Sequence, residues 1–177
     1  ETQPVGLRVR VKNHGKRPWQ EELAIIDRVM RAVSSTSDPE ELVSLYWDGI
    51  DELISLPHYL AVSRRGVSFP QYLITRSSRF TEDINPWTQR EKLPLLSGGV
   101  LQDIAYANKP VIIDDLDKRL SKDDPAHFFL QGFEVLVALP NYDGGEGLNV
   151  GMSLFERRSD FDPSIVPALH WQASLFG

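Results

Sequence analysis

The strongest constraint on the fold is the stretch from Gly132 to Asp162, which has the pattern of a β-hairpin. Glu134 to Leu139 is almost wholly apolar and rich in β-branched residues, as in a strand that is covered on both faces. A glycine-rich turn follows, and Leu148 to Glu156 then alternates, which predicts a second strand paired antiparallel with the first. We expect Pro140 to end the first strand, because proline has no backbone N–H.

The second strand of this hairpin has two different faces. One face is apolar and suited to receive helices, with Leu148, Val150, Met152 and Leu154. The other face is small and polar, with Asn149, Gly151 and Ser153. We therefore expect helices on the first face and room for a cavity above the second.

The composition fits one globular domain with a hydrophobic core. The chain has 177 residues, of which 41% are hydrophobic and 25% charged. It contains no apolar run long enough to span a membrane and no signal-peptide pattern, so we expect a cytoplasmic protein without a membrane partner. The absence of cysteine excludes disulfides, thiolate catalysis and thiolate metal sites. We expect the chain to be a part of a longer protein.

Charge divides the chain into a basic start and an acidic remainder. Residues 1–18 carry five Lys or Arg against one Glu, a net charge of +4, which leaves −10 for the rest of a chain whose total is −6. An acidic surface is poorly suited to nucleic-acid phosphates, so no nucleic-acid partner is expected. We interpret residues 1–18 as a basic linker or tail and residues 19–177 as a single domain.

Two helices are predicted near the start of that domain. The first runs from Trp19 to Val33, with an apolar stripe at the spacing of a coiled-coil seam, formed by Trp19, Leu23, Ile26, Met30 and Val33. The second begins after Asp38, where Asp38 caps the helix, Pro39 takes its first position and Glu41 completes a capping box. Its buried face is predicted to hold Leu42, Leu45, Tyr46, Ile50, Leu53 and Ile54.

The remaining pattern alternates strands with covering segments. Strands are predicted at 59–64, 69–76 and 109–114, and helices at 99–108 and after the Asp162-Pro163 start signal. The irregular stretches 77–97 and 115–131 carry apolar anchors, as segments that cover part of a fold commonly do.

In this order, several short motifs resemble those of a GAF domain. They are Gly99-Val100-Leu101 followed by Ala105 to Asp114 with its Lys-Pro-Val, then Gly132 to Pro140, Gly151, and Phe161-Asp162. The resemblance extends from about Pro39 to Phe176. It implies an α+β, profilin-like, three-layer fold with an antiparallel sheet of five or six strands. Terminal helices would cover one face, and a small-molecule pocket would lie on the other under the cover segments. A PAS domain is the rival fold, but it lacks the paired N-terminal helices.

The resemblance also bears on cofactors, through the places where this chain departs from the family. Cyclic-nucleotide-binding members are similar to one another in an Asn-Lys…Phe…Asp-Glu motif, of which only Phe161 is present here, while Ile165 stands where the Asp is expected. This argues against cGMP or cAMP. Members that attach a bilin covalently and members that reduce methionine sulfoxide need cysteine, so both activities are excluded. The cofactor therefore stays unknown.

Other chemistry has weaker signals. The four histidines show no paired metal-ligand spacing, although His127 lies beside Asp123 and Asp124 and could ligate a haem or metal. Asp114, Asp115 and Asp117 could hold Mg²⁺ or Ca²⁺, but loop carboxylates after a buried strand are the simpler interpretation, so no metal is expected. No nucleophile–base pair is visible, and we predict that the chain is not an enzyme.

Two functional surfaces are predicted. The candidate pocket residues are Tyr72, Phe80, Trp87, Leu101, Ile104, Asp114, Phe128, Phe129, Asn149 and Ser153. The stripe on the first helix is predicted to form a homodimer. GAF domains commonly occur in bacterial signalling proteins, ahead of kinase, cyclase, phosphodiesterase or PP2C-like phosphatase output domains. The resemblance therefore implies a sensory or regulatory domain that relays a signal to an output domain of the same parent chain. The alternative is an effector-free dimerisation module.

Overall fold

The structure is a computed structural model that describes residues 18–54, 58–167 and 169–170, without the side chains of residues 47, 50, 51 and 54. These residues fall into two compact units that divide between Pro57 and His58, and each unit is described separately. Apart from its last residue, the predicted basic linker at 1–18 lies outside the described residues. None of the described helices is long and apolar enough to span a membrane.

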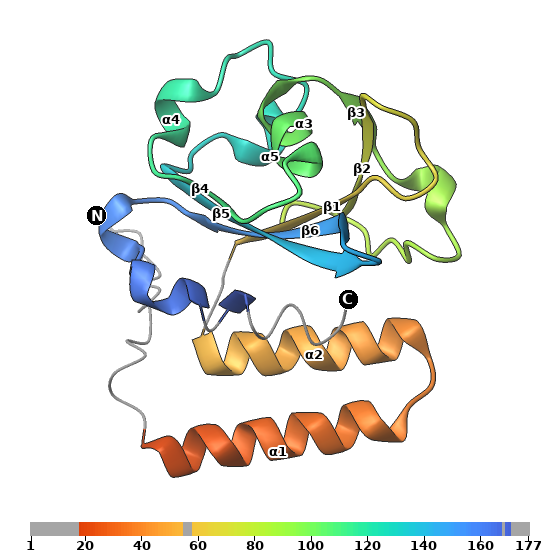
Figure 1. The fold of residues 1–177 in the computed structure, drawn as a ribbon, viewed down its shortest axis with the longest axis vertical. Helices are drawn as coiled ribbons and strands as arrows, with labels where there is room; N and C mark the ends of the chain where they lie inside the picture. Colours follow the sequence, from red (N-terminus) through yellow and green to blue (C-terminus); the bar gives the residue numbers. More distant parts are fainter. Residues whose placement is uncertain (1–17, 55–57, 168, 171–177) are drawn as a thin grey trace, which may run out of the picture. The chain divides into compact units, whose positions relative to one another are not determined.

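The first unit is a pair of helices, α1 (Trp19–Ser35) and α2 (Pro39–Ile54), joined by a short turn (Figure 1). The predicted start of α2 is confirmed, because Asp38 Oδ1 accepts a hydrogen bond from the Glu40 backbone N–H at 2.9 Å. The capping-box prediction is wrong in one detail. The Glu41 carboxylate accepts from the Thr36 hydroxyl, at 2.5 Å, which ties it to the turn before α2.

The two helices approach each other closely at Gly49, which is buried in α2. A Cβ atom placed there would lie 2.5 Å from Val29 Cγ2 of α1, so only glycine allows this separation. An ion pair between Arg28 and Glu52 joins the same two helices. The surface of α1 that faces α2 therefore contains Val29, which is not part of the predicted apolar stripe.

The second unit is built on one six-stranded sheet in which all neighbouring strands are antiparallel. The strands lie in the order β3-β2-β1-β6-β5-β4. Their bounds are β1 (Tyr59–Ser63), β2 (Gln71–Ser77), β3 (Leu95–Ser97), β4 (Val111–Ile113), β5 (Val135–Asp143) and β6 (Glu146–Phe155). The short strand β3 was not predicted. β4 is an edge strand with Ile112 exposed, although it was predicted to be buried.

The predicted central hairpin is confirmed as β5 and β6, the longest strands of the sheet. Its turn is tighter than expected, with Gly144 and Gly145 at φ of 58° and 86° between Asp143 and Glu146. Pro140 does not end β5, since it pairs with Val150 in the ladder. The pairing of β4 with β5 reaches only as far as Ala138, so the missing N–H of Pro140 deprives no neighbour of a hydrogen bond.

Three helices cover one face of this sheet, namely α3 (Gly99–Tyr106), α4 (Leu116–Arg119) and α5 (His127–Leu130) (Figure 1). The core cluster beneath them includes Val150, Met152 and Leu154 of β6. Side chains alternate along a strand, so Asn149, Gly151 and Ser153 lie on the opposite face. The two faces of β6 are therefore reversed from the prediction, in which the polar face lay under the cover segments.

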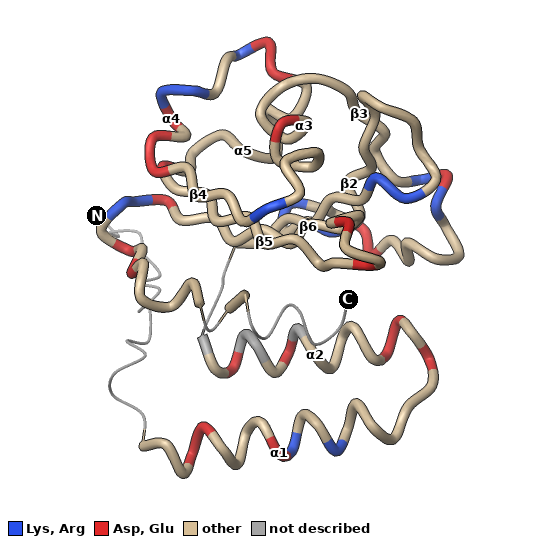
Figure 2. The backbone as a smooth tube through the Cα atoms, in the orientation of Figure 1, with Lys and Arg blue, Asp and Glu red and all other residues tan. Residues whose placement is uncertain are grey.

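Three short 3₁₀ helices complete the described unit, η1 (Arg90–Lys92), η2 (Arg158–Asp160) and η3 (Pro163–Ile165). The Asp162 cap is confirmed, because its Oδ1 accepts a hydrogen bond from the Ser164 N–H at 2.9 Å. Charged residues are scarce in the sheet itself. In the six described strands they are Arg76 of β2 and the two residues beside the hairpin turn, Asp143 and Glu146 (Figure 2).

Candidate functional site

The ten predicted pocket residues lie in three different environments. Tyr72, Leu101, Ile104 and Phe129 belong to the buried core under the covering helices, where Phe80 packs against Phe129 at a ring separation of 6.0 Å. Trp87, Phe128 and Asp114 are exposed. Asn149 and Ser153 lie on the opposite face of the sheet, paired with Ser63 and Tyr59 of β1. The structure therefore does not bring the ten together around one space.

The phenol of Tyr72 is a buried polar group beneath the covering helices. Its side chain is 0% exposed, and its hydroxyl donates a hydrogen bond to the Gly98 carbonyl oxygen at 3.1 Å. Burial raises the pKa of Tyr72, and the nearby Asp124 carboxylate raises it further. Tyr72 is thus a neutral donor that holds the start of α3 against β2.

Asp124 also holds the start of α3 in place. Its Oδ2 accepts a hydrogen bond from the Val100 N–H at 2.9 Å, in the first turn of α3, and its Oδ1 accepts from the Ala126 N–H at 2.8 Å. The helix has no cap from its own N-cap residue, Gly98, so a carboxylate from the segment between α4 and α5 takes that role. The N-terminus of α3 is therefore occupied by the chain's own carboxylate.

The raised pKa of Tyr72 predicts a loss of stability at high pH. Above about pH 10 the unfolded chain loses the phenol proton while the folded state keeps it, so stability is complete below that pH and falls as the pH rises further. The fall is up to about 1.4 kcal/mol per pH unit for each such tyrosine. In the Tyr72→Phe variant, the free energy of unfolding measured with urea should fall less steeply between about pH 10 and 12.

Burial also raises the pKa of Tyr46. The Tyr72→Phe variant should therefore keep part of the dependence of stability on pH. Tyr142→Phe is the matched control, since Tyr142 is 36% exposed, and this variant should retain the wild-type dependence of stability on pH. Equal slopes in wild type and Tyr72→Phe would contradict the expected role of the buried phenol.

The described part of the chain contains a cleft of about 250 Å³ beside the end of β2. It is half open to solvent and mostly polar, and it is lined by Tyr59, Thr75, Arg76, Ser77, Phe80, Thr81, Glu82, Asp83 and Ile84. Only Phe80 among these was a predicted pocket residue. Trp87, another predicted member, borders the cleft through Arg76, whose guanidinium carbon lies 5.6 Å from the centre of the Trp87 ring.

The shape of β2 explains why Thr75 and Arg76 line this cleft. Between β1 and β2 the pairing shifts at Ala61/Val62, so that Arg76 pairs with Ala61 while Ile74 pairs with Val62. Thr75 is the extra residue of this β-bulge, and it donates a hydrogen bond to the Ala61 carbonyl oxygen at 3.3 Å. A bulge re-aims side chains at the end of a strand, and no pattern in the sequence marks it.

The loop that forms the far wall of the cleft is anchored to α5. The Arg79 guanidinium donates hydrogen bonds to the carbonyl oxygens of Phe128 and Gln131, both at 2.5 Å, and it lies over the Phe133 ring at 4.9 Å. Phe80 adds its edge-on contact with Phe129. The wall of the cleft is therefore connected directly to the end of a covering helix.

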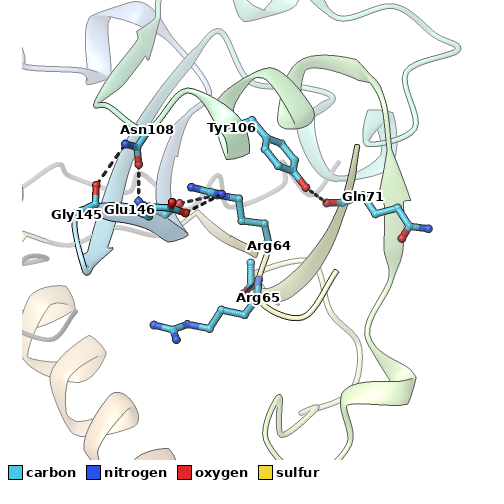
Figure 3. A network of polar contacts seen from close by, with 9 residues as sticks. Arg64, Arg65, Gln71, Tyr106, Asn108, Gly145 and Glu146 are labelled. Atoms are coloured by element: carbon cyan, nitrogen blue, oxygen red, sulfur yellow. Dashed lines mark hydrogen bonds and ion pairs between the residues drawn. The ribbon is translucent and has the colours of Figure 1, made fainter. Parts of the chain in front are cut away.

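A second polar network joins the tip of the β5–β6 hairpin to α3 (Figure 3). The side chain of Arg64 is 17% exposed, forms an ion pair with Glu146 at 3.4 Å, and donates to the Gly147 carbonyl oxygen at 3.2 Å. The same guanidinium lies 5.4 Å from the centre of the Tyr106 ring, and Tyr106 donates to the Gln71 carbonyl oxygen at 2.7 Å. The Nε and Nη1 donors of Arg64 are therefore engaged within the fold.

Asn108 closes this network with a backbone φ of 52°, a conformation that asparagine tolerates. Its side-chain oxygen accepts from the Gly147 N–H at 2.5 Å, and its side-chain nitrogen donates to the Gly145 carbonyl oxygen at 3.4 Å (Figure 3). Because Arg64, Tyr106 and Asn108 are each bonded to another part of the chain, we interpret the network as a structural clasp.

Four of the residues considered as metal ligands, His127, Asp115, Asp117 and Asp124, are engaged with other parts of the chain. His127 Nδ1 lies 3.0 Å from the Ser121 carbonyl oxygen, and Asp115 and Asp117 form ion pairs with Arg119 and Arg158 at 2.5 and 3.8 Å. Among the described residues, no group of three or more His, Asp or Glu could hold a metal ion.

Comparison with known proteins identifies the fold. No protein-family model and no curated protein matches the sequence. Among solved structures, the GAF domain of a phosphoenolpyruvate-protein phosphotransferase from Coxiella burnetii is similar, with 13% identity and a TM-score of 0.64 over 90% of this chain and 92% of that one.

Two further structures show the range of proteins that share this fold. The GAF domain of a two-component sensor histidine kinase from Bacillus halodurans has 8% identity and a TM-score of 0.56 over 78% of this chain and 90% of that one. A free methionine-R-sulfoxide reductase from Neisseria meningitidis has 13% identity and a TM-score of 0.54 over 88% and 85%. The chain therefore has a GAF fold, as the sequence motifs predicted.

Proposed function

We propose that this chain, which has a GAF fold, is a non-catalytic sensory or regulatory module that dimerises through α1. Its terminal helices would relay a signal to an output domain of the same parent protein. Similar GAF domains come from signalling proteins, including the sensor histidine kinase, which supports the general role. A kinase or PP2C-like phosphatase as output, and a bacterial cytoplasm as location, are part of this proposal.

The observation that carries the proposal is the apolar stripe on α1. Its members are exposed although they are large and apolar, at 67% for Trp19, 55% for Leu23, 42% for Ile26 and 45% for Met30, while Val33 is half-buried. A contiguous apolar surface of this kind marks an interaction site. The 4-3-4-3 spacing suits a second helix with the same spacing, which another copy of this chain supplies.

The contact that holds α1 to α2 lies at one edge of the stripe. Val29, which meets Gly49 of α2, is three residues after Ile26 and four before Val33, so it adjoins the edge of the stripe that these two residues form, while Leu23 and Met30 lie further round the helix. A partner could therefore pack on the exposed side of the stripe, which contains Leu23 and Met30, without displacing α2. Two copies that pair in this way can transmit a small shift of one helix against the other.

The similar reductase is the reason to consider an enzyme instead. This chain has no cysteine, so thiol-based reduction is not open to it. The buried Tyr72 phenol and the Asp124 carboxylate are both used in holding α3, which makes a regulatory role the better explanation of the core.

The test of the proposal is the oligomeric state of the whole chain. Multi-angle light scattering at tens of micromolar, about the range of an ordinary helical interface, should give the mass of a dimer. A mass that stays at 20.1 kDa over this range would contradict dimerisation.

Binding of a small organic molecule is the second candidate function, and the cleft beside β2 favours it. It offers aromatic rings, hydroxyl groups and charges of both signs in a volume of about 250 Å³. The anchored loop after β2 lines the same cleft, and the exposed Trp87 contacts Arg76 of that lining.

A further inference from the structure

The cleft beside β2 carries charges of both signs. Arg76 lines it from the sheet, and Glu82 and Asp83 line it from the loop after β2. Arg76 is the one Lys or Arg within the six described strands. A ligand with a single charge would be attracted by one part of this lining and repelled by the other.

The hydroxyl groups of the cleft also differ in what they can offer a ligand. Thr75 donates its proton to the Ala61 carbonyl oxygen, which leaves its oxygen lone pairs to accept a hydrogen bond. Ser77 accepts from the Arg79 backbone N–H at 3.0 Å, which leaves its own proton to be donated. The lining therefore contains both a free acceptor and a free donor, besides the charges.

We propose that this cleft binds a small zwitterion that carries an ammonium and a carboxylate, such as an α-amino acid. The ammonium would face Glu82 and Asp83, and the carboxylate would face the Arg76 guanidinium, with a donor such as Ser77 beside it. A volume of about 250 Å³ suits a molecule of this size, because pockets for drug-sized ligands start at about 300 Å³. Tyr59 and Phe80 supply the apolar part of the lining.

Two other occupants fit the lining less well. A divalent cation prefers several oxygen ligands close together, whereas here the Arg76 guanidinium shares the cleft with the two carboxylates. An anion such as phosphate would meet the two carboxylates at close range. A zwitterion places each of its charges beside an opposite one.

The position of the cleft would couple ligand binding to the helices that cover the sheet. The wall formed by residues 77–84 holds α5 through Arg79 and Phe80, so a ligand that moves this wall also moves the covering layer. This step rests on the proposed regulatory function. The binding site itself does not depend on dimerisation.

The experiment is a titration of the whole chain. The twenty α-amino acids, first screened by thermal shift at millimolar concentration, should include at least one that raises the melting temperature and binds in calorimetry. The N-acetyl derivative of that amino acid lacks the ammonium, and its methyl ester lacks the carboxylate. Each should bind at least about tenfold more weakly than the parent amino acid.

Variants then locate the site. Glu82→Gln combined with Asp83→Asn should weaken binding at least about tenfold, whereas Glu91→Gln, an exposed acid of η1 outside the cleft, should leave it unchanged. The acids replaced are exposed, so the variants should fold, and unchanged unfolding curves would verify this.

Several results would overturn the proposal. They are no binding by any of the twenty, binding of either derivative as tight as that of the parent amino acid, binding unaffected by the Glu82/Asp83 variant, or binding of Mg²⁺ or phosphate in place of the amino acid. Light scattering on the same samples separates the two hypotheses. A dimer without binding overturns only the ligand, and a monomer that binds overturns only the dimer.

Discussion

Replacing Gly99 with alanine should destabilise the sheet unit by about 3–4 kcal/mol. Gly99 has a φ of 72°, and alanine there incurs a backbone cost of roughly 1–2 kcal/mol. A Cβ atom at this position would also lie 2.5 Å from both carboxylate oxygens of Asp124, which are held by two backbone N–H groups. The change in the free energy of unfolding, measured with urea, tests this expectation.

Gly145→Ala is the matched control, since Gly145 has a φ of 86° but no atom within 4 Å of the position of the added Cβ. This substitution should lower the free energy of unfolding only by the cost of the left-handed backbone conformation, about 1–2 kcal/mol. In a double-mutant cycle, Asp124→Gly should recover much of the additional loss in Gly99→Ala. Equal losses at Gly99 and Gly145 would show that the Asp124 contact is not held in place as described.

Leu23→Glu should raise the dissociation constant of the proposed dimer by about 1000-fold or more. Leu23 belongs to the exposed stripe, and a symmetric pairing would bury the new carboxylate from both copies without partners. That penalty is about 4 kcal/mol or more, which corresponds to the stated change in affinity. Sedimentation equilibrium over a wide concentration range measures the effect.

The control for this variant is Ala24→Glu, which adds the same charge at an exposed position one residue further along α1. That position is rotated by about 100° from Leu23, away from the stripe. The control should dimerise like the wild type. If both variants dissociate equally, net charge and not the stripe governs the association.

Local patterns were sufficient to predict most of the elements. The two N-terminal helices, the Asp38 cap and the β5–β6 hairpin follow from spacing and capping residues, and all were confirmed. The short strand β3 was missed, because three residues have no period of their own and are a strand only through their pairing with β2.

The arrangement of the faces and of the site depends on long-range contacts. Both faces of β5 are apolar, so its sequence does not show which face receives α3, and the faces of β6 were assigned the wrong way round. The cleft depends on a β-bulge opposite Ala61 and on a loop held by Arg79. The sequence did contain one signal for the contact between Asp124 and α3. Gly98-Gly99 begins a helix but offers no capping side chain, so a residue from elsewhere in the chain, such as Asp124, is needed as the cap.

A single cysteine in the middle of the stripe tests the central claim, pairing through α1, most directly. The chain has no cysteine of its own, so Ile26→Cys gives one thiol per chain. Ile26 is the middle residue of the stripe, so in a symmetric pair it should lie near its own copy, within reach of a disulfide. Under mild oxidation, Ile26→Cys should form a covalent dimer rapidly and completely, while Ala24→Cys should remain mostly monomeric. Slow cross-linking of both variants to the same extent would contradict pairing through this stripe.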